Sequence, residues 1–252
     1  MSAPKIIFLM GATATGKTDL AVALQQRFPV EIVSVDSALI YRGMNIGTAK
    51  PDALTLSKAP HHLIDIIDAA EHYSAWDFVE QANRLVREIS ERGNIPLLAG
   101  GTMLYFNALE QGLNSLPQAD AELRASLDAE ASKIGWEAMH QRLAEVDPVS
   151  AARIKPGDSQ RIQRALEVEQ LSGQALSQLQ QGETTGYAGE VFKISLHAPD
   201  RALLHQRIEQ RFMQMLSLGF VDEVAGFHQR GDLNLNMPSM RCVGYRQVWQ
   251  YL

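Results

Sequence analysis

The chain has 252 residues, of which 46% are hydrophobic and 21% charged, a composition typical of a folded globular protein and not of a disordered one. Its single cysteine, Cys242, excludes an internal disulfide and a cysteine cluster for zinc, and we expect it to be a small, partly buried apolar residue. The formal net charge of −6 counts against a nucleic-acid partner unless basic residues gather locally. The first apolar run, residues 6–10, is too short for a secretory segment or a membrane span, so we expect a cytoplasmic protein with no membrane partner.

Strands and helices alternate through the first 112 residues. Short apolar runs predict the strands, and apolar stripes at helical spacing predict the helices. The predicted strands are residues 5–10, 30–35, 63–67 and 95–99, and the predicted helices are residues 17–28 and 75–92. Ser74 caps the second helix, and Asp77, three residues later, completes a capping box. This alternation predicts an α/β layer structure with a parallel sheet.

The pattern changes near Gly112, where the segments become helical and more polar. Helical spacing continues as far as a glycine- and threonine-rich linker at residues 180–189. A strand is then predicted at residues 191–197, followed by helices at residues 200–216 and 221–228. We therefore expect residues 1–112 and 191–252 to form one α/β core, with an all-helical domain, residues 113–190, inserted into it.

A phosphate-binding motif follows the first predicted strand. Residues 11–18 read GATATGKT and match the P-loop pattern G-x-x-x-x-G-K-[ST]. Glycines let the backbone turn tightly and turn its N–H groups toward an anion, the lysine neutralises phosphate oxygens, and the final hydroxyl binds Mg²⁺. The predicted phosphate-binding residues are Gly11, Ala12, Thr13, Ala14, Thr15, Gly16, Lys17 and Thr18, with Thr18 as the metal ligand. The motif leaves the reaction open, because kinases, ATPases and other diphosphate-binding enzymes all use it.

Four further runs are more specific. They are residues 36–51 (DSALIYRGMNIGTAKP), 60–65 (PHHLID), 97–105 (LLAGGTMLY) and 241–246 (RCVGYR). Together with the P-loop they resemble the tRNA dimethylallyltransferase family, the bacterial tRNA isopentenyltransferases, over essentially the whole chain. Ala12 stands where many members have proline, at a variable position of the loop. The resemblance implies a P-loop NTPase-like parallel sheet flanked by helices, with the helical insertion binding tRNA.

The resemblance also implies a reaction. Members of the family transfer dimethylallyl from dimethylallyl diphosphate to N6 of the adenosine that is 3′-adjacent to the anticodon of tRNA. The P-loop would then hold the leaving diphosphate together with Mg²⁺. The expected partners are the anticodon stem-loop of tRNA and dimethylallyl diphosphate, and the protein is expected to be a monomer. Members of the family usually continue past the position of Leu252, so the resemblance implies a C-terminal extension that this sequence does not contain.

Three residues are candidates for catalysis. Asp36 follows a predicted strand, where α/β folds place their sites, and an adenine amine is a poor nucleophile that needs a base. Without the resemblance, Asp36 is equally well explained as a helix cap. Arg211 matches the family's diphosphate-binding arginine, the alternative being a surface arginine, and Thr102 matches a residue that contacts the target nucleotide. His61 and His62 are not expected to bind a metal, because adjacent strand residues point in opposite directions.

Local charge supports a tRNA partner. Residues 151–164 hold four basic side chains and one acidic one, and Arg161 and Arg164 fall on one helical face. The simpler explanation of such a cluster is a solvated surface. The resemblance assigns tRNA contacts to Asp36, Ser37, Ala38, Leu39, Thr102, Arg124, Gln160, Arg161, Ile162, Gln163, Arg164, Arg241, Cys242, Val243, Gly244, Tyr245 and Arg246.

Two other functions compete with this one. A P-loop small-molecule kinase would explain the phosphate loop, and the helical insertion would imitate its lid. Turnover of ATP without an isoprenoid donor would favour that alternative. A catalytically silent tRNA-binding module is opposed by the presence of Lys17, Asp36 and Thr102 together.

Overall fold

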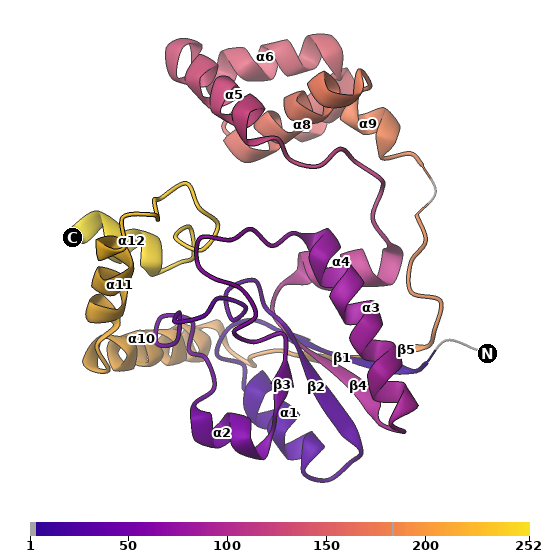
Figure 1. Cartoon of the computed structure of the whole chain (residues 1–252), viewed down its shortest axis with the longest axis vertical. Coiled ribbons are helices and arrows are strands. Elements are labelled where there is room, and N and C mark those ends of the chain that lie inside the picture. Colours follow the sequence, from indigo (N-terminus) through magenta and orange to yellow (C-terminus); the bar gives the residue numbers. More distant parts are fainter. Residues whose placement is uncertain (1–3, 183) are drawn as a thin grey trace. The chain divides into compact units, whose positions relative to one another are not determined.

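The computed structural model describes residues 4–182 and 184–252, and the chain divides into two compact units (Figure 1). The first unit contains Met1–Gln111 and Gly186–Leu252, and the second contains Gly112–Thr185. The predicted insertion extended to residue 190. The residues after 185 belong to the first unit because the Tyr187 N–H donates to the carbonyls of Leu109 and Glu110, each at 3.1 Å.

The first unit is built on a parallel sheet, as predicted. Its strand order is β3-β2-β4-β1-β5. The strands are β1 (Ile6–Gly11), β2 (Val30–Val35), β3 (His61–His62), β4 (Ile95–Gly100) and β5 (Val191–Leu196). Each described pair of strands is parallel. The carboxyl ends of β2, β4 and β1 are therefore neighbours at one edge of the sheet, and the polar residues that follow each of these strands meet there.

Helices bury both faces of this sheet, which explains why its central strands are almost continuously apolar. On one face Phe8, Val33 and Leu98 pack with α3 (Ala75–Glu91) and α4 (Met103–Gln111). On the other face their sequence neighbours, Leu9, Ile32 and Leu97, pack with α1 (Lys17–Gln25). The alternation follows from the two-residue period of a strand.

The capping box predicted for α3 is confirmed. Ser74 Oγ accepts from the N–H of Asp77 at 3.2 Å, and Asp77 Oδ2 accepts from the N–H of Ser74 at 2.8 Å. Both bonds satisfy N–H groups that a helix start leaves without intrahelical partners.

The strand predicted at residues 63–67 is wrong. The observed strand β3 contains only His61 and His62, and the backbone then turns into the left-handed region at Leu63 (φ 61°) and Asp65 (φ 56°). A strand cannot continue through such angles. The ammonium group of Lys50 binds the Asp65 carboxylate and so ties this loop to the 36–51 run. The short helix α2 (Ala53–Lys58) had not been predicted.

A third group of helices completes the first unit. It consists of α10 (Arg201–Ser217), α11 (Phe220–Gln229) and α12 (Tyr245–Tyr251). Their core holds Phe220 and Tyr245, whose rings meet edge to face with centroids 5.1 Å apart, together with Met44 from the 36–51 run. The run is thereby packed against helices that lie far from it in the sequence.

In the described residues of the second unit, every regular element is a helix. The unit contains α5 (Ala121–Ile134), α6 (Trp136–Val146), α7 (Pro148–Arg153), α8 (Ser159–Ser172) and α9 (Leu176–Leu179). Its apolar core surrounds the fully buried carboxylate of Glu167, which is paired with Arg124 at 2.8 Å and Arg164 at 2.6 Å. In the described parts of both units, no helix is long and apolar enough to cross a membrane.

Candidate active site

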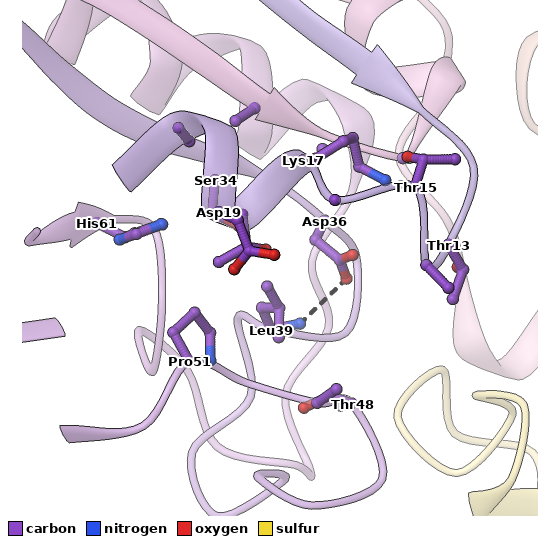
Figure 2. Close-up of a pocket in the computed structure, with 18 of the residues that line it drawn as sticks. Thr13, Thr15, Lys17, Asp19, Ser34, Asp36, Leu39, Thr48, Pro51 and His61 are labelled. Atoms are coloured by element: carbon purple, nitrogen blue, oxygen red, sulfur yellow. Dashed lines mark hydrogen bonds between the residues drawn. The ribbon is translucent and has the colours of Figure 1, made fainter. Parts of the chain in front are cut away.

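A cavity of about 490 Å³ lies in the first unit at the carboxyl ends of β1, β2 and β4 (Figure 2). P-loop residues form one part of its lining, and side chains that follow β2 form another. Helix α10 contributes two arginines, Arg207 and Arg211, which lie one helical turn apart. The cavity thus gathers the phosphate motif, a carboxylate and basic side chains from distant parts of the chain.

The P-loop has the conformation that its sequence predicts. Gly11 lacks room for a side chain, since a Cβ there would lie 2.7 Å from the Leu196 carbonyl oxygen. The turn uses left-handed backbone at Ala14 (φ 63°) and at Gly16 (φ 87°). Gly16 precedes α1 and provides no side-chain cap, so the first N–H groups of the helix are left for an anion.

The lysine of the motif lies against its own loop. Lys17 Nζ donates to the carbonyl oxygens of Gly11 at 2.8 Å and Ala12 at 2.6 Å. Burial lowers the pKa of Lys17, the Asp36 carboxylate raises it, and Arg211 lowers it further. These opposing effects place one negative and two positive groups within electrostatic reach of each other.

The carboxylate of Asp36 is held by a local turn. Its Oδ1 accepts from the N–H groups of Ala38 at 2.8 Å and Leu39 at 3.2 Å, and Figure 2 marks the second bond. Both bonds fall on the same oxygen, so Oδ2 is left for another partner. The turn therefore fixes the carboxylate at the end of β2 without using all of its acceptor capacity.

Thr102 joins the ends of two neighbouring strands. Its Oγ1 accepts from the Ser37 N–H at 3.1 Å, and its own N–H donates to the Val35 carbonyl at 3.2 Å. The close approach depends on Gly100, where a Cβ would lie 2.0 Å from the Val35 oxygen. Glycine at this position lets β4 bring Thr102 beside Asp36.

Arg211 is half-buried and lines the cavity. Burial lowers its pKa and the nearby Asp36 carboxylate raises it. Its Nη2 donates to the Thr48 carbonyl at 3.3 Å. Thr48 also lines the cavity, and Figure 2 shows it on the segment that passes below Asp36 and Leu39.

Several lining residues had not been predicted from the sequence. They include Asp19, Ser34, Thr48 and His61. The His61 Nδ1 lies 2.7 Å from the Ala59 carbonyl, burial lowers the pKa of the ring, and the ring turns toward the cavity (Figure 2). Asp19 directly follows the P-loop, and Thr48 and His61 lie within the specific runs at residues 36–51 and 60–65, so each of these three had a sequence signal. Ser34, within β2, depends on strand placement.

The donor atoms around Thr18 suit Mg²⁺. The cavity lining offers oxygen atoms from Thr18, Asp19 and Asp36. Within residues 4–182 and 184–252, no group of three or more His, Cys, Asp or Glu side chains is arranged to hold a metal ion. Mg²⁺ fits such a site because it takes one or two protein oxygens and completes its shell with phosphates and water.

The residues predicted to contact RNA in the second unit differ in their availability. Gln160 and Arg161 are exposed on α8, and the Arg161 side chain is 74% exposed although it pairs with Asp158 at 3.0 Å. Arg124 and Arg164 are bound to the buried Glu167. The Gln163 amide donates to Asp128 at 2.7 Å, and Gln163 is partly exposed. The Ile162 side chain is fully buried in the core, so it is not available to RNA.

The second predicted RNA-binding stretch, residues 241–246, lies in the first unit before α12. Arg241, Val243 and Arg246 are exposed, with Val243 at 87%, and Cys242 and Gly244 are partly exposed. Burial, followed by the Asp36 charge, raises the pKa of Cys242 to about 11, so it stays a neutral thiol. Tyr245 is fully buried, so its side chain is not accessible to RNA.

Comparison with known proteins connects this site to a family. Residues 39–252 match the family model described as IPP transferase. A tRNA dimethylallyltransferase of Paraburkholderia xenovorans (strain LB400) is 60% identical over 248 residues, which cover 97% of this chain and 79% of the relative. Another, from Alkalilimnicola ehrlichii, is 59% identical over 249 residues, covering 99% and 78%. The crystal structure of a tRNA isopentenylpyrophosphate transferase from Bacillus halodurans is 36% identical, with a TM-score of 0.66 and coverage of 98% and 77%.

Proposed function

The chain belongs to the IPP transferase family, and from this premise we propose that it transfers the dimethylallyl group of dimethylallyl diphosphate to N6 of the adenosine 3′-adjacent to the tRNA anticodon, with release of diphosphate. The observation that carries the proposal is the placement of Asp36 beside the P-loop in one cavity. An anion site adjacent to a carboxylate suits a reaction that expels diphosphate and removes a proton.

The donor diphosphate is held by the P-loop. Its oxygens bind the free N–H groups at the start of α1, Lys17 and Arg211, all of which line the cavity. Lys17 exchanges its bonds to the Gly11 and Ala12 carbonyls for phosphate oxygens. Mg²⁺ held by Thr18 supplies further charge neutralisation when bound. These groups stabilise the negative charge that grows on the leaving diphosphate.

Asp36 acts as the base. The N6 nitrogen forms a bond to C1 of the dimethylallyl group, while the C1–O bond breaks and its electron pair leaves with the diphosphate. The N6 proton passes to Oδ2 of Asp36, since Oδ1 is bound to the Ala38 and Leu39 N–H groups. Those two bonds keep the acceptor oxygen in one position as the proton transfers.

Thr102 positions the adenine. Its Oγ1 accepts from Ser37, which leaves the hydroxyl hydrogen free to donate to a base placed beside Asp36. The adenine must leave its stack to reach this cavity, at a cost of a few kcal/mol. Asp36 and Leu39 line the same cavity, which supports the proposal that residues 36–39 contact the nucleotide.

RNA binding is assigned to exposed basic side chains in each unit. Arg161 with Gln160 provides contacts on the helical unit, which is proposed to bind the anticodon stem-loop, and Arg241 with Arg246 provides contacts on the first unit. Phosphate contacts of this kind make affinity fall with salt. Monomeric state and cytoplasmic location stay predictions from the sequence.

The kinase alternative is disfavoured, because these relatives are named tRNA dimethylallyltransferases and their similarity extends over nearly the whole chain. The test is to incubate the protein with unmodified tRNA, Mg²⁺ and radiolabelled dimethylallyl diphosphate and to count label on the RNA. We expect label in tRNA and no hydrolysis of ATP. ATP turnover without labelled RNA would reject the proposal in favour of a kinase.

The role of Asp36 has its own test. Asp36→Asn should lower single-turnover transfer by about 10²–10⁴-fold, while tRNA still binds. The matched control is Asp120→Asn, because Asp120 makes the same kind of bond to a backbone N–H (Leu123, 2.8 Å) in the helical unit. An unchanged rate for Asp36→Asn would remove the base from this mechanism.

A further inference from the structure

One carboxylate outside the cavity binds three consecutive backbone N–H groups. Glu223 of α11 accepts from Asn45 at 2.9 Å and Ile46 at 2.7 Å through Oε2, and from Gly47 at 3.1 Å through Oε1. The hydroxyl of Tyr245 also donates to Oε1. Successive N–H groups that converge in this way form an anion nest, and here the anion is a side chain of the protein itself.

The nest belongs to a tight turn that lacks other partners for these N–H groups. The Ala49 N–H donates to the Ile46 carbonyl and the Lys50 N–H to the Asn45 carbonyl, each at 2.9 Å. As at the start of a helix, the first N–H groups of such a turn have no acceptor within it. The Glu223 carboxylate satisfies them, and so it determines where the turn sits relative to α11.

Packing fixes the same turn against α11 and α12. A Cβ on Gly47 would lie 2.1 Å from the Phe220 ring and 2.6 Å from the Tyr245 ring. Tyr245 is fully buried, and burial together with the Glu223 bond raises its pKa, which keeps its hydroxyl protonated as a donor. The Gly47 backbone therefore packs closely against the Phe220 and Tyr245 rings, and the Glu223 carboxylate binds its N–H group.

The far end of the turn reaches the candidate active site. The Thr48 carbonyl, next to Gly47, accepts from Arg211 Nη2 at 3.3 Å. Thr48 and Ala49 line the cavity, and Ala49 and Arg211 also line a second cavity of about 530 Å³. The turn is thus a wall between the two cavities, and its carbonyl holds the guanidinium that faces the P-loop.

We propose that Glu223 is a positioning residue that holds the 45–48 turn so that the Thr48 carbonyl orients Arg211 toward the donor diphosphate. This rests on the proposed function, in which Arg211 binds that diphosphate. Glu223 itself touches no substrate. Its carboxylate accepts from the N–H groups of the turn, and it affects the reaction only through the position of Arg211.

The test measures binding of inorganic pyrophosphate with Mg²⁺ by calorimetry in a double-mutant cycle. Glu223→Gln keeps the side-chain shape but replaces one acceptor oxygen by a donor, so we expect pyrophosphate to bind about tenfold more weakly. Arg211→Ala should weaken binding by at least as much. If Glu223 acts through Arg211, the double variant binds no more weakly than Arg211→Ala alone.

The matched control is Asp222→Asn, which removes a neighbouring charge from α11 but no bond of the nest; its pyrophosphate affinity should equal that of the wild type. Equal affinity of Glu223→Gln and the wild type would overturn the proposal, and so would additive losses in the double variant. If Glu223→Gln does not fold, Glu223→Asp shortens the carboxylate and should give an intermediate loss that is again absent when Arg211 is alanine. A wild type that binds no pyrophosphate would instead overturn the P-loop assignment, and the inference with it.

Discussion

The P-loop and the 45–48 turn present the same chemistry in opposite states. Each offers backbone N–H groups that lack an acceptor within their own turn or helix, and each contains a glycine with no room for a Cβ, Gly11 in the P-loop and Gly47 in the turn. The P-loop donors face a cavity, whereas the turn donors face Glu223. An anion nest can bind a ligand where no side chain of the protein accepts from its N–H groups. Where a carboxylate of the protein accepts from them, the nest holds part of the structure in place.

Among the variants that compare the two nests, removing the P-loop lysine should have the largest effect on anion binding. Lys17→Ala is expected to weaken pyrophosphate binding by about 10–100-fold, because charge-assisted bonds to phosphate are lost. Folding should change little, since Lys17 bonds only to two carbonyls of its own loop. Calorimetry with pyrophosphate and a urea denaturation curve check the two expectations. A variant that loses stability but keeps its affinity would reverse the comparison.

A side chain added to the 45–48 turn should reduce the stability of the fold, in contrast to Lys17→Ala, which should reduce affinity. Gly47→Ala is expected to destabilise folding by about 1–3 kcal/mol, because its Cβ overlaps the Phe220 and Tyr245 rings. The control is Gly226→Ala on α11, where a Cβ meets nothing within 4 Å and helix propensity should add about 0.5–1 kcal/mol of stability. Urea denaturation measures both, and equal behaviour of the two variants would contradict the packing described for the turn.

A second carboxylate whose acceptors are used within the protein, Glu31, allows a test by pH. Glu31 of β2 accepts from Arg92 at 2.7 Å and from Asn94 at 2.8 Å, and the Arg92 bond is the largest cause that lowers its pKa from 4.5 to about 2. A depressed folded pKa means that this stabilisation is present above pH 4.5 and is lost as the pH falls toward 2.

Glu31→Gln should therefore cost about 1–3 kcal/mol at pH 7, since a charged hydrogen-bond partner is lost. The difference from the wild type should shrink between pH 4.5 and pH 2, as followed by denaturation at each pH. Transfer activity at pH 7 should be unchanged under folding conditions, because Glu31 does not line the cavity. A stability difference that stays constant down to pH 2 would contradict the lowered pKa.

The smallest expected effect is on the salt dependence of tRNA binding, and it compares two arginines of α8. Arg161 is exposed to solvent, whereas Arg164, one turn along α8, is paired with the buried Glu167. Arg161→Ala should reduce the slope of log affinity for tRNA against log salt by about 1 and leave stability within about 0.5 kcal/mol. Lys133→Ala, an exposed cation at the end of α5, is the control and should leave the slope unaltered. An unaltered slope in Arg161→Ala would place the phosphate contact elsewhere.

Much of the first unit could be predicted because its signals are local. The strand at residues 30–35 was predicted with its observed bounds, and the α3 capping box and the P-loop were both read from side chains a few residues apart. The predicted strand at residues 63–67 failed because apolar residues also fill a loop whose backbone is left-handed at Leu63 and Asp65. Periodicity records which side chains are buried, but it does not record φ.

The two arginines of α8 illustrate the other limit. Arg161 and Arg164 lie three residues apart and have the same chemistry, so their sequence places them on one face. Only packing separates them, because Glu167 is buried beside Arg164 and Arg124 while Arg161 points to solvent. A charged residue within the apolar stripe of α8 was the one signal that a buried ion pair existed.

The family resemblance named Asp36 as the candidate base, whereas the sequence by itself determined the phosphate loop, the parallel α/β core and the helical insertion. These depend on motifs and periods that span fewer than about 20 residues, where side-chain direction follows from helix and strand geometry. The tertiary structure decided which backbone N–H groups are bound by a side chain of the protein and which remain available to a ligand. Glu223 meets the Asn45 N–H across 178 positions of the chain, and Arg211 meets Thr48 across 163. Such contacts arise from how helices pack on a sheet, which no local pattern encodes.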